Sequence, residues 1–310
     1  MRFTRIALLG TALAGLALPA LAETRIGVTM TSFDNPHLTV LLDAMREEAA
    51  RHEGVTLVTE DAQLDVARQL NQVQNFAANG LDAIIVNAVD GDSTAAITAQ
   101  ARDAGIPLVY VNHPPAELDA GMPEGSAYVG SAERDAGRFQ AEAVCQMMDG
   151  TGRALILMGP LENRAALVRT QTVEEIFASD DCGIEVVEKQ TANWNRVQAV
   201  DLVSAWVTAG LEFDAIVSNN DEMAIGAIQA LKSAGMSMDD VVIAGIDATA
   251  DGLAAMAAGD LDVTVFQNTV GQGHLAVQAA VSAAGGAAME PEAWVPFEAV
   301  TAENLSQYAN

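Results

Sequence analysis

An internal repeat constrains the fold of this chain more than any other feature of its sequence. Residues 81–87 (Leu-Asp-Ala-Ile-Ile-Val-Asn) are matched by residues 213–219 (Phe-Asp-Ala-Ile-Val-Ser-Asn). Two further strand-like runs, 25–30 and 153–158, precede the two copies by similar distances. In both halves, short β-branched runs alternate with longer segments of helical period, which is the pattern of parallel βα units. We therefore predict two similar α/β lobes, each with a doubly wound parallel sheet covered by helices.

The first βα unit shows how the individual elements are predicted. Residues 24–31 read as a buried strand, and Asn35-Pro36 then supplies a helix N-cap and a proline for the first helical position. Apolar residues follow at helical spacing, namely Leu38, Leu41, Leu42, Met45 and Ala49. Further strands are predicted at 55–59, 81–87 and 106–112, and Asn79-Gly80 is a left-handed signal that ends the helix before it.

Composition limits both the number of domains and the kind of partner. A chain of 310 residues with 50% hydrophobic residues is long enough for about two domains with cores of their own. It carries 15 Lys and Arg against 42 Asp and Glu, a formal net charge of -27. Phosphates and anionic lipids attract basic residues, so nucleic acid and membrane surfaces are excluded as main partners. A small neutral or cationic ligand fits this charge better.

The first 22 residues have the pattern of a secretory signal peptide. Arg2 and Arg5 precede the apolar run 6–18, and Pro19-Ala20-Leu21-Ala22 offers an Ala-x-Ala cleavage site. The alternative is a membrane anchor, but the run is shorter than the roughly 20 residues that a span needs. Cleavage near Ala22 leaves 13 basic residues and a net charge of -29. We therefore expect a soluble mature protein in a bacterial periplasm or outside the cell.

Export bears on Cys145 and Cys182, the two cysteines of the chain. In an oxidising compartment, a pair of thiols more often forms a disulfide than a catalytic or metal site. Two separate buried thiols are the alternative, because spacing in the sequence does not show whether the two Cα atoms come close enough. A metal site built on His37 and His113 is disfavoured, since the four histidines of the chain form no closely spaced cluster with cysteines or carboxylates.

The predicted strands end in polar residues. In open parallel sheets, ligands bind beyond the carboxyl ends of the strands. Two lobes that present such edges to each other would enclose a cleft of carboxamide and carboxylate groups, which suits a ligand made of hydroxyls. The polar ends are Thr31, Asn87, Asn112-His113, Asn219-Asn220-Asp221 and Asp247.

Several short sequence motifs in the second half of the chain resemble those of a known family. They are 219–227 (Asn-Asn-Asp-Glu-Met-Ala-Ile-Gly-Ala), 230–235 (Ala-Leu-Lys-Ser-Ala-Gly), Gly245-Ile246-Asp247, Asp251-Gly252 and Gln267. In this order and spacing, over essentially the whole mature chain, they resemble the ribose-binding-protein type of periplasmic solute-binding protein. Such proteins are the receptor components of ABC importers and of some chemotaxis systems.

The resemblance implies a type I periplasmic binding protein with a three-segment hinge near Ser131, Gln267 and Pro296. The expected division is a signal peptide at 1–22, an N-terminal lobe of 23–131 with 268–296, and a C-terminal lobe of 132–267 with 297–310. The implied ligand-binding residues are Thr31, Asn35, Asn87, Asn112 and His113 in the first lobe, Arg169, Trp194, Asn220 and Asp247 in the second, and Gln267 at the hinge.

The chain departs from the ribose pattern at two places. The aromatic pair expected after Asn35-Pro36 is His37-Leu38, and the Asp-Arg pair that grips a pyranose is Asn112-His113. Phe33 is the candidate for the missing aromatic face, and His37 joins the ligand set. Glu133 and Gln63 are lesser candidates.

Each site residue also has a plainer structural interpretation. Trp194 lies in a polar run, so stacking on a ligand is favoured over a place in the core, where Trp206 and Trp294 are expected. Arg169 either grips neighbouring hydroxyls or is a solvated surface residue. The alternative for Asp247, Asn87 and Asn112 is a helix cap, and only one of Asn219, Asn220 and Asp221 need reach the cleft.

Two segments are similar to the subgroup of this family that binds rhizopine and inositol. They are 188–196 (Glu-Lys-Gln-Thr-Ala-Asn-Trp-Asn-Arg) and 111–114 (Val-Asn-His-Pro). Rhizopines are inositol amines, so this likeness implies a cyclic or acyclic polyol as ligand.

The function that follows is a monomeric, non-enzymatic binder that delivers a sugar or polyol to an inner-membrane ABC permease, without cofactor or metal. One alternative is a periplasmic receptor that feeds chemotaxis. Another is the sensory core of a lactose-repressor-type regulator, which would begin with a basic helix-turn-helix where this chain has a signal peptide. An enzyme is disfavoured because Gly-x-Ser-x-Gly, glycine-rich phosphate loops and His-Glu-x-x-His are absent from the sequence.

Overall fold

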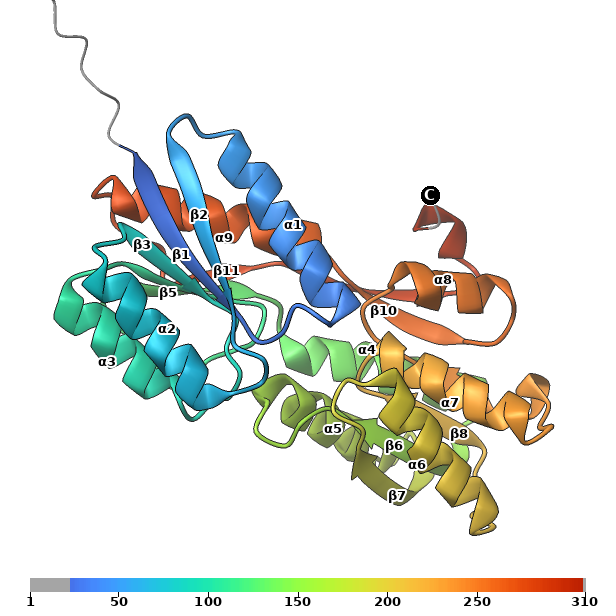
Figure 1. Ribbon diagram of the computed structural model, residues 1–310. Helices are drawn as coiled ribbons and strands as arrows, with labels where there is room; N and C mark the ends of the chain where they lie inside the picture. Colours follow the sequence, from blue (N-terminus) through green and yellow to red (C-terminus); the bar gives the residue numbers. More distant parts are fainter. Residues whose placement is uncertain (1–22, 309–310) are drawn as a thin grey trace, which may run out of the picture.

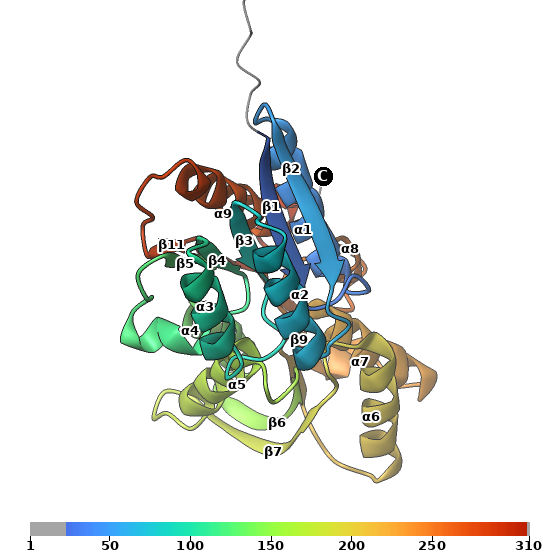
Figure 2. The same ribbon diagram turned by 60° about the vertical axis from the view of Figure 1, so that its left-hand side comes forward.

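A computed structural model describes residues 23–308, which fold into two α/β lobes (Figures 1 and 2). Each lobe has a six-stranded sheet with helices on both faces. The two similar lobes predicted from the internal repeat are therefore confirmed. The signal peptide predicted at 1–22, with its cleavage near Ala22, lies outside the described residues.

The first lobe is built on the sheet with strand order β11-β5-β4-β3-β1-β2, all of whose neighbours run parallel. Its strands are β1 (Thr24–Met30), β2 (Val55–Asp61), β3 (Ala83–Val86), β4 (Leu108–Val111), β5 (Ser126–Gly130) and β11 (Glu292–Trp294). Its helices are α1 (Pro36–Ala50), α2 (Val66–Ala78), α3 (Thr94–Ala104), the 3-10 turn η1 (Ala116–Ala120) and α9 (Thr269–Ala284).

The second lobe repeats this plan with the order β12-β10-β9-β8-β6-β7. Its strands are β6 (Thr151–Met158), β7 (Gly183–Thr191), β8 (Ala215–Ser218), β9 (Val242–Ala244), β10 (Val263–Gln267) and β12 (Phe297–Thr301). Its helices are α4 (Glu133–Met147), α5 (Arg164–Phe177), α6 (Arg196–Thr208), α7 (Asp221–Ser233), α8 (Ala250–Ala257) and the 3-10 turns η2 (Met238–Asp240) and η3 (Leu305–Gln307). The sheet is not wholly parallel, because β12 runs antiparallel to β10.

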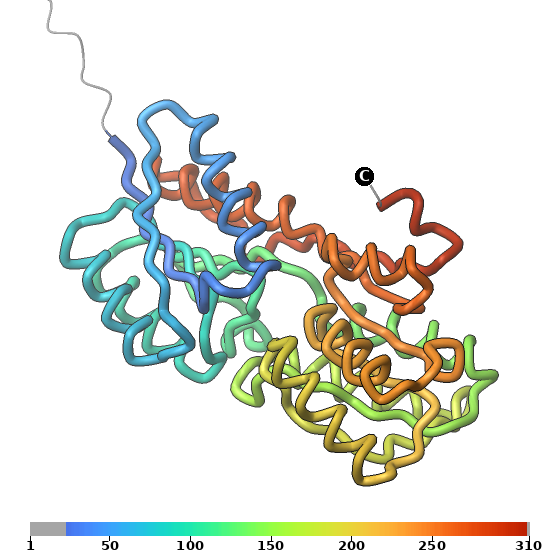
Figure 3. The backbone as a smooth tube through the Cα atoms, turned by 45° about the vertical axis from the view of Figure 1, so that its right-hand side comes forward, coloured from blue at the N-terminus to red at the C-terminus, as the bar shows by residue number. Residues whose placement is uncertain are grey.

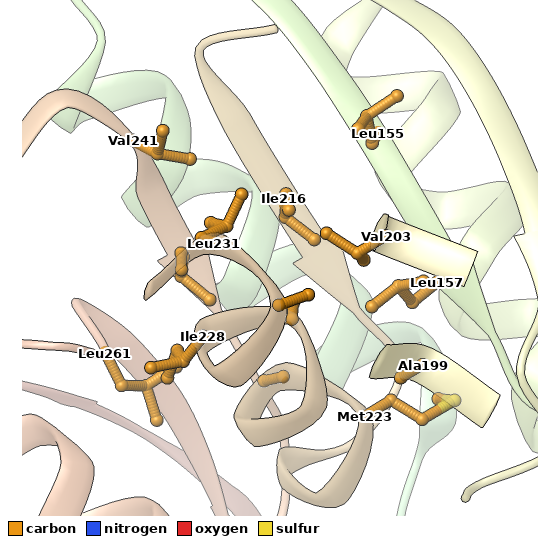
Figure 4. Packing of buried hydrophobic residues seen from close by; sticks show 14 of the residues in the cluster. Leu155, Leu157, Ala199, Val203, Ile216, Met223, Ile228, Leu231, Val241 and Leu261 are labelled. Atoms are coloured by element: carbon orange, nitrogen blue, oxygen red, sulfur yellow. The ribbon is translucent and has the colours of Figure 1, made fainter. Parts of the chain in front are cut away.

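Alternating side chains of the central strands build a core on each face of the sheet. In the first lobe, Ile26 and Val28 of β1 pack against α1 and α9. Gly27 faces the opposite side, where a Cβ would lie 2.6 Å from the ring of Phe76 on α2, so only glycine lets this helix approach. In the second lobe, Leu155 and Leu157 pack against α6 and α7 (Figure 4).

The chain passes between the two sheets at three places, which Figure 3 allows the reader to follow. Residues 131–132 join β5 to α4, residue 268 joins β10 to α9, and residues 295–296 join β11 to β12. The short β11 therefore pairs with β5 in the first sheet, while β12 pairs with β10 in the second.

Of the two tryptophans expected in the core, the structure buries one and leaves the other largely exposed. Trp206 is buried among the apolar side chains under α6. For Trp294 the expectation is wrong, because it lies on the edge strand β11 where the hinge leaves the sheet and is 48% exposed. Its ring meets that of Tyr128 edge to face, with centroids 5.5 Å apart, and its Nε1 donates to Glu292.

Within residues 23–308, no helix has both the length and the hydropathy that crossing a bilayer requires. Cys145, near the end of α4, and Cys182, just before β7, form a disulfide with Cα atoms 5.8 Å apart. Of the two alternatives that the sequence left open, the structure has the bonded pair. It ties α4 to the sheet at the end of the lobe where β6 and β7 begin.

We expect this disulfide to stabilise the second lobe by restricting the unfolded chain. The closed loop spans 37 residues of sequence separation, for which chain entropy gives a contribution of about 4 kcal/mol. Replacing both Cys145 and Cys182 by Ala should lower the free energy of unfolding by a few kcal/mol in urea denaturation. A reductant should destabilise the parent in the same way and leave the double variant unchanged. Two alkylatable thiols in the unreduced, denatured parent would contradict the bond.

Candidate ligand-binding cleft

A closed cavity lies between the lobes, at the carboxyl ends of the parallel strands. This is where the switch in strand order opens a crevice in sheets of this kind. Polar groups from both lobes and from the hinge meet here. The lining residues are Asn35, His37, Leu38, Asn112, His113, Ala165, Arg169, Trp194, Asn220, Asp247 and Gln267.

Caps and left-handed turns aim these side chains into the cavity. Asn35 caps α1 by accepting from the backbone nitrogen of His37 (2.9 Å), which places His37 on the first turn of the helix. Three lining residues that are not glycine have positive φ: Asn112 (65°), Trp194 (59°) and Asp247 (120°). L-residues adopt this region rarely, and such residues cluster at functional sites. Asp149, in a turn far from the cleft, shows that positive φ also occurs elsewhere in the chain, so the strain supports the site only together with the cavity.

Arg169 is the charged centre of the cleft. It lies on α5, is 95% buried, and its Nε donates to Glu133 at 2.6 Å. Its Nη1 donates to the carbonyl of Asn219 (2.8 Å), and the guanidinium lies 5.8 Å from the centroid of the Trp194 ring. Burial works against the charge of Arg169, but the carboxylates of Glu133 and Asp247 keep its pKa raised. The surface alternative for Arg169 is thereby excluded.

Two histidines of the first lobe face this charge as neutral rings. Burial lowers the pKa of His37 to about 3 and that of His113 to about 4, and Arg169 acts in the same direction on both. Nδ1 of His113 lies 2.8 Å from the carbonyl oxygen of Ala88, which only accepts, so Nδ1 carries the proton and Nε2 remains an acceptor.

Asp247 is the ionisable group of the cavity that has no close cation of its own. Its Oδ1 lies 3.7 Å from Nδ1 of the neutral His37, and its side chain accepts no hydrogen bond from residues 23–308. Burial raises the pKa of this carboxyl well above its usual range, although Arg169 opposes the shift. The helix-cap alternative does not apply, because Thr249 caps α8. A donor from a ligand would satisfy this group.

Two buried donors of the lining also lack a partner among residues 23–308, Trp194 Nε1 and Gln267 Nε2. The Trp194 ring is half-buried and lies against Gly159, where a Cβ would come within 2.3 Å of it. Unpartnered buried donors are uncommon in folded proteins and are explained where a ligand accepts from them. The cavity thus offers both hydrogen-bond donors and an acceptor to a ligand that carries hydroxyl groups.

Direct contacts between the lobes hold the cleft shut. Gly91 N of the first lobe donates to the carbonyl of Glu162 in the second (3.2 Å). Asn163 Nδ2 of the second lobe lies 3.1 Å from Nδ1 of His113, and because that nitrogen directs its proton to Ala88, the two groups are in contact without a hydrogen bond. Arg164, at the start of α5, pairs with Asp119 of the first lobe. Within the cavity itself, His37 of the first lobe and Asp247 of the second lie 3.7 Å apart.

Of the twelve ligand-binding residues predicted from the sequence, nine line this cavity: Asn35, His37, Asn112, His113, Arg169, Trp194, Asn220, Asp247 and Gln267. Asn220 is also the cap of α7. Glu133 lies behind Arg169 as its ion-pair partner.

The other predicted residues do not line this cavity, although Thr31 lines a neighbouring pocket together with Asn35, His113 and Trp194. Asn87 is fully buried, and its side chain bonds the backbone of Thr31 (3.2 Å) and Val111 (3.3 Å), so both Asn87 and Thr31 brace the strand ends. Phe33 is 37% exposed and does not line the cavity, so it supplies no aromatic face there. Gln63 lies exposed in the turn before α2.

Sequence reasoning missed Leu38 and Ala165 of the lining and Asn163 beside it. Asn163 caps α5 by accepting from Ala165 N (2.9 Å), as Asn35 caps α1. The internal repeat carries the signal, because both asparagines follow the first strand of their lobe. Apolar contacts such as Leu38 have no such signal, since they look like any core position.

Other features of the described residues do not compete with this cleft. Residues 23–308 contain no group of three His, Cys, Asp or Glu side chains placed to hold a metal ion. A wider groove between α3 and α9 lies at the opposite end of the first sheet, where β4 and β5 begin. It is lined by apolar residues such as Ala283 and Met289, and its two charged residues, Arg102 and Glu124, are exposed rather than buried as in the cleft.

Comparisons with known proteins agree with this geometry. A family model described as a periplasmic binding protein domain matches residues 26–288. The chain is 51% identical to a Rhizobium meliloti protein assigned by name to rhizopine binding, over 97% of each chain.

Two solved structures are similar over nearly their whole length. A solute-binding protein of an ABC transporter from Bacillus halodurans, with bound myo-inositol, has a TM-score of 0.87 and 40% identity over 94% of this chain and 99% of that one. The Caulobacter myo-inositol binding protein, bound to myo-inositol, has a TM-score of 0.86 and 26% identity over 94% and 98%.

The buried histidines predict how stability depends on pH. The unfolded chain binds protons with a histidine pKa near 6.5, whereas His37 and His113 bind them only near 3 and 4. The two rings therefore make a contribution that lowers the free energy of unfolding as the pH drops below about 6.5, by up to about 1.4 kcal/mol per pH unit for each ring. The raised pKa values of the buried Asp221 and Asp247 act in the opposite direction, so the histidine contribution is read as a difference between variants.

Urea denaturation between pH 7.5 and 5 should show that the double variant His37→Asn and His113→Asn loses less stability, or gains more, than the parent as the pH falls. The same pH dependence in both proteins would contradict the assignment of neutral rings.

Proposed function

We propose that this chain, which belongs to the periplasmic binding protein family, binds a cyclic polyol of the inositol type in the cleft and delivers it to an ABC permease. The observation that carries the proposal is the set of unpartnered polar groups in the closed cavity. Trp194 Nε1 and Gln267 Nε2 can donate, and the Asp247 carboxylate, which accepts no hydrogen bond from residues 23–308, can accept. Each hydroxyl of a polyol can both donate and accept, so such a ligand supplies the kind of partner that each of these groups lacks.

The relatives support the choice of a polyol. The Rhizobium meliloti relative is named for rhizopine and the two similar structures hold myo-inositol. In this chain the first lobe contributes Asn112 and a neutral His113 to the cavity, with no Asp or Arg. Neutral groups suit a ligand that presents only hydroxyls, and the stacked Trp194 suits the C–H face of a ring.

The wider role follows from the same proposal. The lobes, taken as 23–131 with 268–296 and 132–267 with 297–310, would open about the hinge at Ser131, Gln267 and Pro296. The exported form, cleaved near Ala22, would act as a monomer in the periplasm. It would release its ligand chemically unchanged, so incubation with myo-inositol should return myo-inositol alone.

The proposal is tested by a thermal-shift screen of the mature protein. A ligand that binds only the folded state raises the stability by about 2.7 kcal/mol at a hundred times its Kd. We expect myo-inositol to raise the Tm more than D-ribose does, because Asn112-His113 replaces a charged pair that would grip a pyranose. A larger shift with ribose, or none with any polyol or sugar, would overturn the assignment.

Two substitutions should weaken binding for different reasons. Trp194→Ala removes apolar contact with the ring face and should weaken all polyols alike, by about 1 to 3 kcal/mol. Asp247→Asn replaces one of two acceptor oxygens by a donor, so its effect should depend on the stereochemistry of the ligand. Calorimetry over a panel of inositol isomers measures both effects.

The matched control for this pair of variants is Asp251→Asn. Asp251 lies four residues from Asp247 but outside the cavity, where it pairs with Arg196 at 2.7 Å. This variant should bind every isomer as the parent does. Parental affinity in both Trp194→Ala and Asp247→Asn, with circular dichroism showing folded protein, would place the binding site elsewhere.

A further inference from the structure

A buried carboxylate lies directly behind the loop that carries Asp247. Asp221 begins α7, has no exposed surface and does not line the cavity. Its Oδ2 accepts from the backbone nitrogen of Thr249 (2.8 Å) and from the hydroxyl of the same residue (3.2 Å). Its Oδ1 accepts from the hydroxyl of Thr264 on β10 (2.7 Å). One side chain thus joins the loop after β9 to the neighbouring strand.

The loop that Asp221 holds is strained at two consecutive residues. Asp247 has a φ of 120° and Ala248 a φ of 51°, and neither is a glycine. Such residues cost about 1 to 3 kcal/mol each and persist only where the surroundings impose them. Both flanks of the pair depend on Asp221: its backbone nitrogen donates to the carbonyl of Ile246 (2.7 Å), and its carboxylate holds Thr249.

Hydrogen bonds also connect the backbone of Ala248 to the carboxylate of Asp221, through Thr264. The backbone nitrogen of Ala248 donates to the hydroxyl oxygen of Thr264 (3.1 Å), whose proton goes to Asp221. Two glycines of the loop also close around the carboxylate. A Cβ on Gly245 or Gly252 would lie 2.2 Å from one of its two oxygens. The loop is therefore shaped to fit this carboxylate on both sides.

We propose that Asp221 is a positioning residue for ligand recognition, which holds residues 246–249 in the left-handed turn that turns the carboxylate of Asp247 toward the cavity. The effect on affinity rests on the proposed function, whereas the effect on the loop does not. Asp221→Asn keeps the shape of the side chain but leaves one acceptor oxygen for the donors of Thr249 and Thr264. The turn should then loosen and Asp247 should lose its fixed direction.

A matched control is available in the same lobe. Asp262 is another carboxylate that accepts from a backbone nitrogen, that of Ile243 at 2.8 Å, at the far end of the sheet from the cleft. Asp262→Asn should lower the stability of the lobe without changing the cleft. Burial raises the pKa of Asp221 to about 7, while its hydrogen bonds from Thr264 and Thr249 oppose the shift, so measurements at pH 8.5 keep it charged.

Calorimetry with myo-inositol would compare the parent, Asp221→Asn, Asp262→Asn, Asp247→Asn and the double variant of Asp221 and Asp247. We expect Asp221→Asn to weaken binding by at least about five-fold in the parent and by less than about two-fold in the Asp247→Asn background. Asp262→Asn should bind as the parent does. Equal losses in both backgrounds, no loss in the parent, or an equal loss from Asp262→Asn would overturn the positioning role.

Hydrogen exchange without ligand makes the test independent of the proposed function. Asp221→Asn should speed exchange of the Ala248 and Thr249 amides at least about five-fold relative to Asp262→Asn, while amides of β6 stay protected in both. Unchanged exchange at Ala248 and Thr249 would overturn the proposal. If the parent does not bind myo-inositol at all but the exchange result holds, the choice of ligand fails and the positioning role stands.

Discussion

The buried ion pair between Arg169 and Glu133 is the interaction on which the cleft depends. Removing one partner of such a pair leaves an uncompensated charge and costs about 3 to 5 kcal/mol. Here the pair, 2.6 Å apart, fixes a guanidinium that adds to the effect of burial on His37 and His113, whose rings stay neutral, and that opposes the effect of burial on Asp247. Burial and one positive charge together therefore set the donor and acceptor character of much of the cavity. Glu133 begins α4, directly after the first hinge crossing, so this charge is anchored where the lobes join.

The two lobes share one type of backbone turn but carry different side chains on it. The turn Ala62-Gln63-Leu64-Asp65 before α2 is repeated as Ala192-Asn193-Trp194-Asn195 before α6. The two middle residues of each turn have φ between 53° and 60°, and the last residue of each caps the helix. Leu64 is 59% exposed, whereas Trp194 lines the cavity. Leu64 and Trp194 also line one neighbouring pocket, so the two turns face each other across the lobes, and the proposed binding residue lies on the turn of the second lobe.

Much of the fold could be predicted from the sequence because the repeat, the Asn35-Pro36 cap and the strand periodicity act locally. The site was predicted where a polar residue ends a strand, as at Asn112 and Asp247. The same rule wrongly placed Asn87 among the residues that line the cavity. Its side chain instead bonds backbone groups at the strand ends, and the sequence does not show in which direction an amide side chain points. Sequence reasoning also missed the antiparallel direction of β12 and the exposed face of Trp294, since both depend on how the hinge returns to the sheets. The positioning contacts of Asp221 emerge only from packing.

A crystal structure of the mature protein with myo-inositol would test the central claim most directly, which is that the closed cleft holds a cyclic polyol. The account predicts one ring between the lobes, with its C–H face on Trp194 and hydroxyls bonded to Asp247, to Gln267 Nε2 and to Trp194 Nε1. Density for the ligand outside this cavity, for instance in the groove between α3 and α9, would contradict it. So would a ring in the cleft that leaves Asp247 and both unpartnered donors without a hydrogen bond.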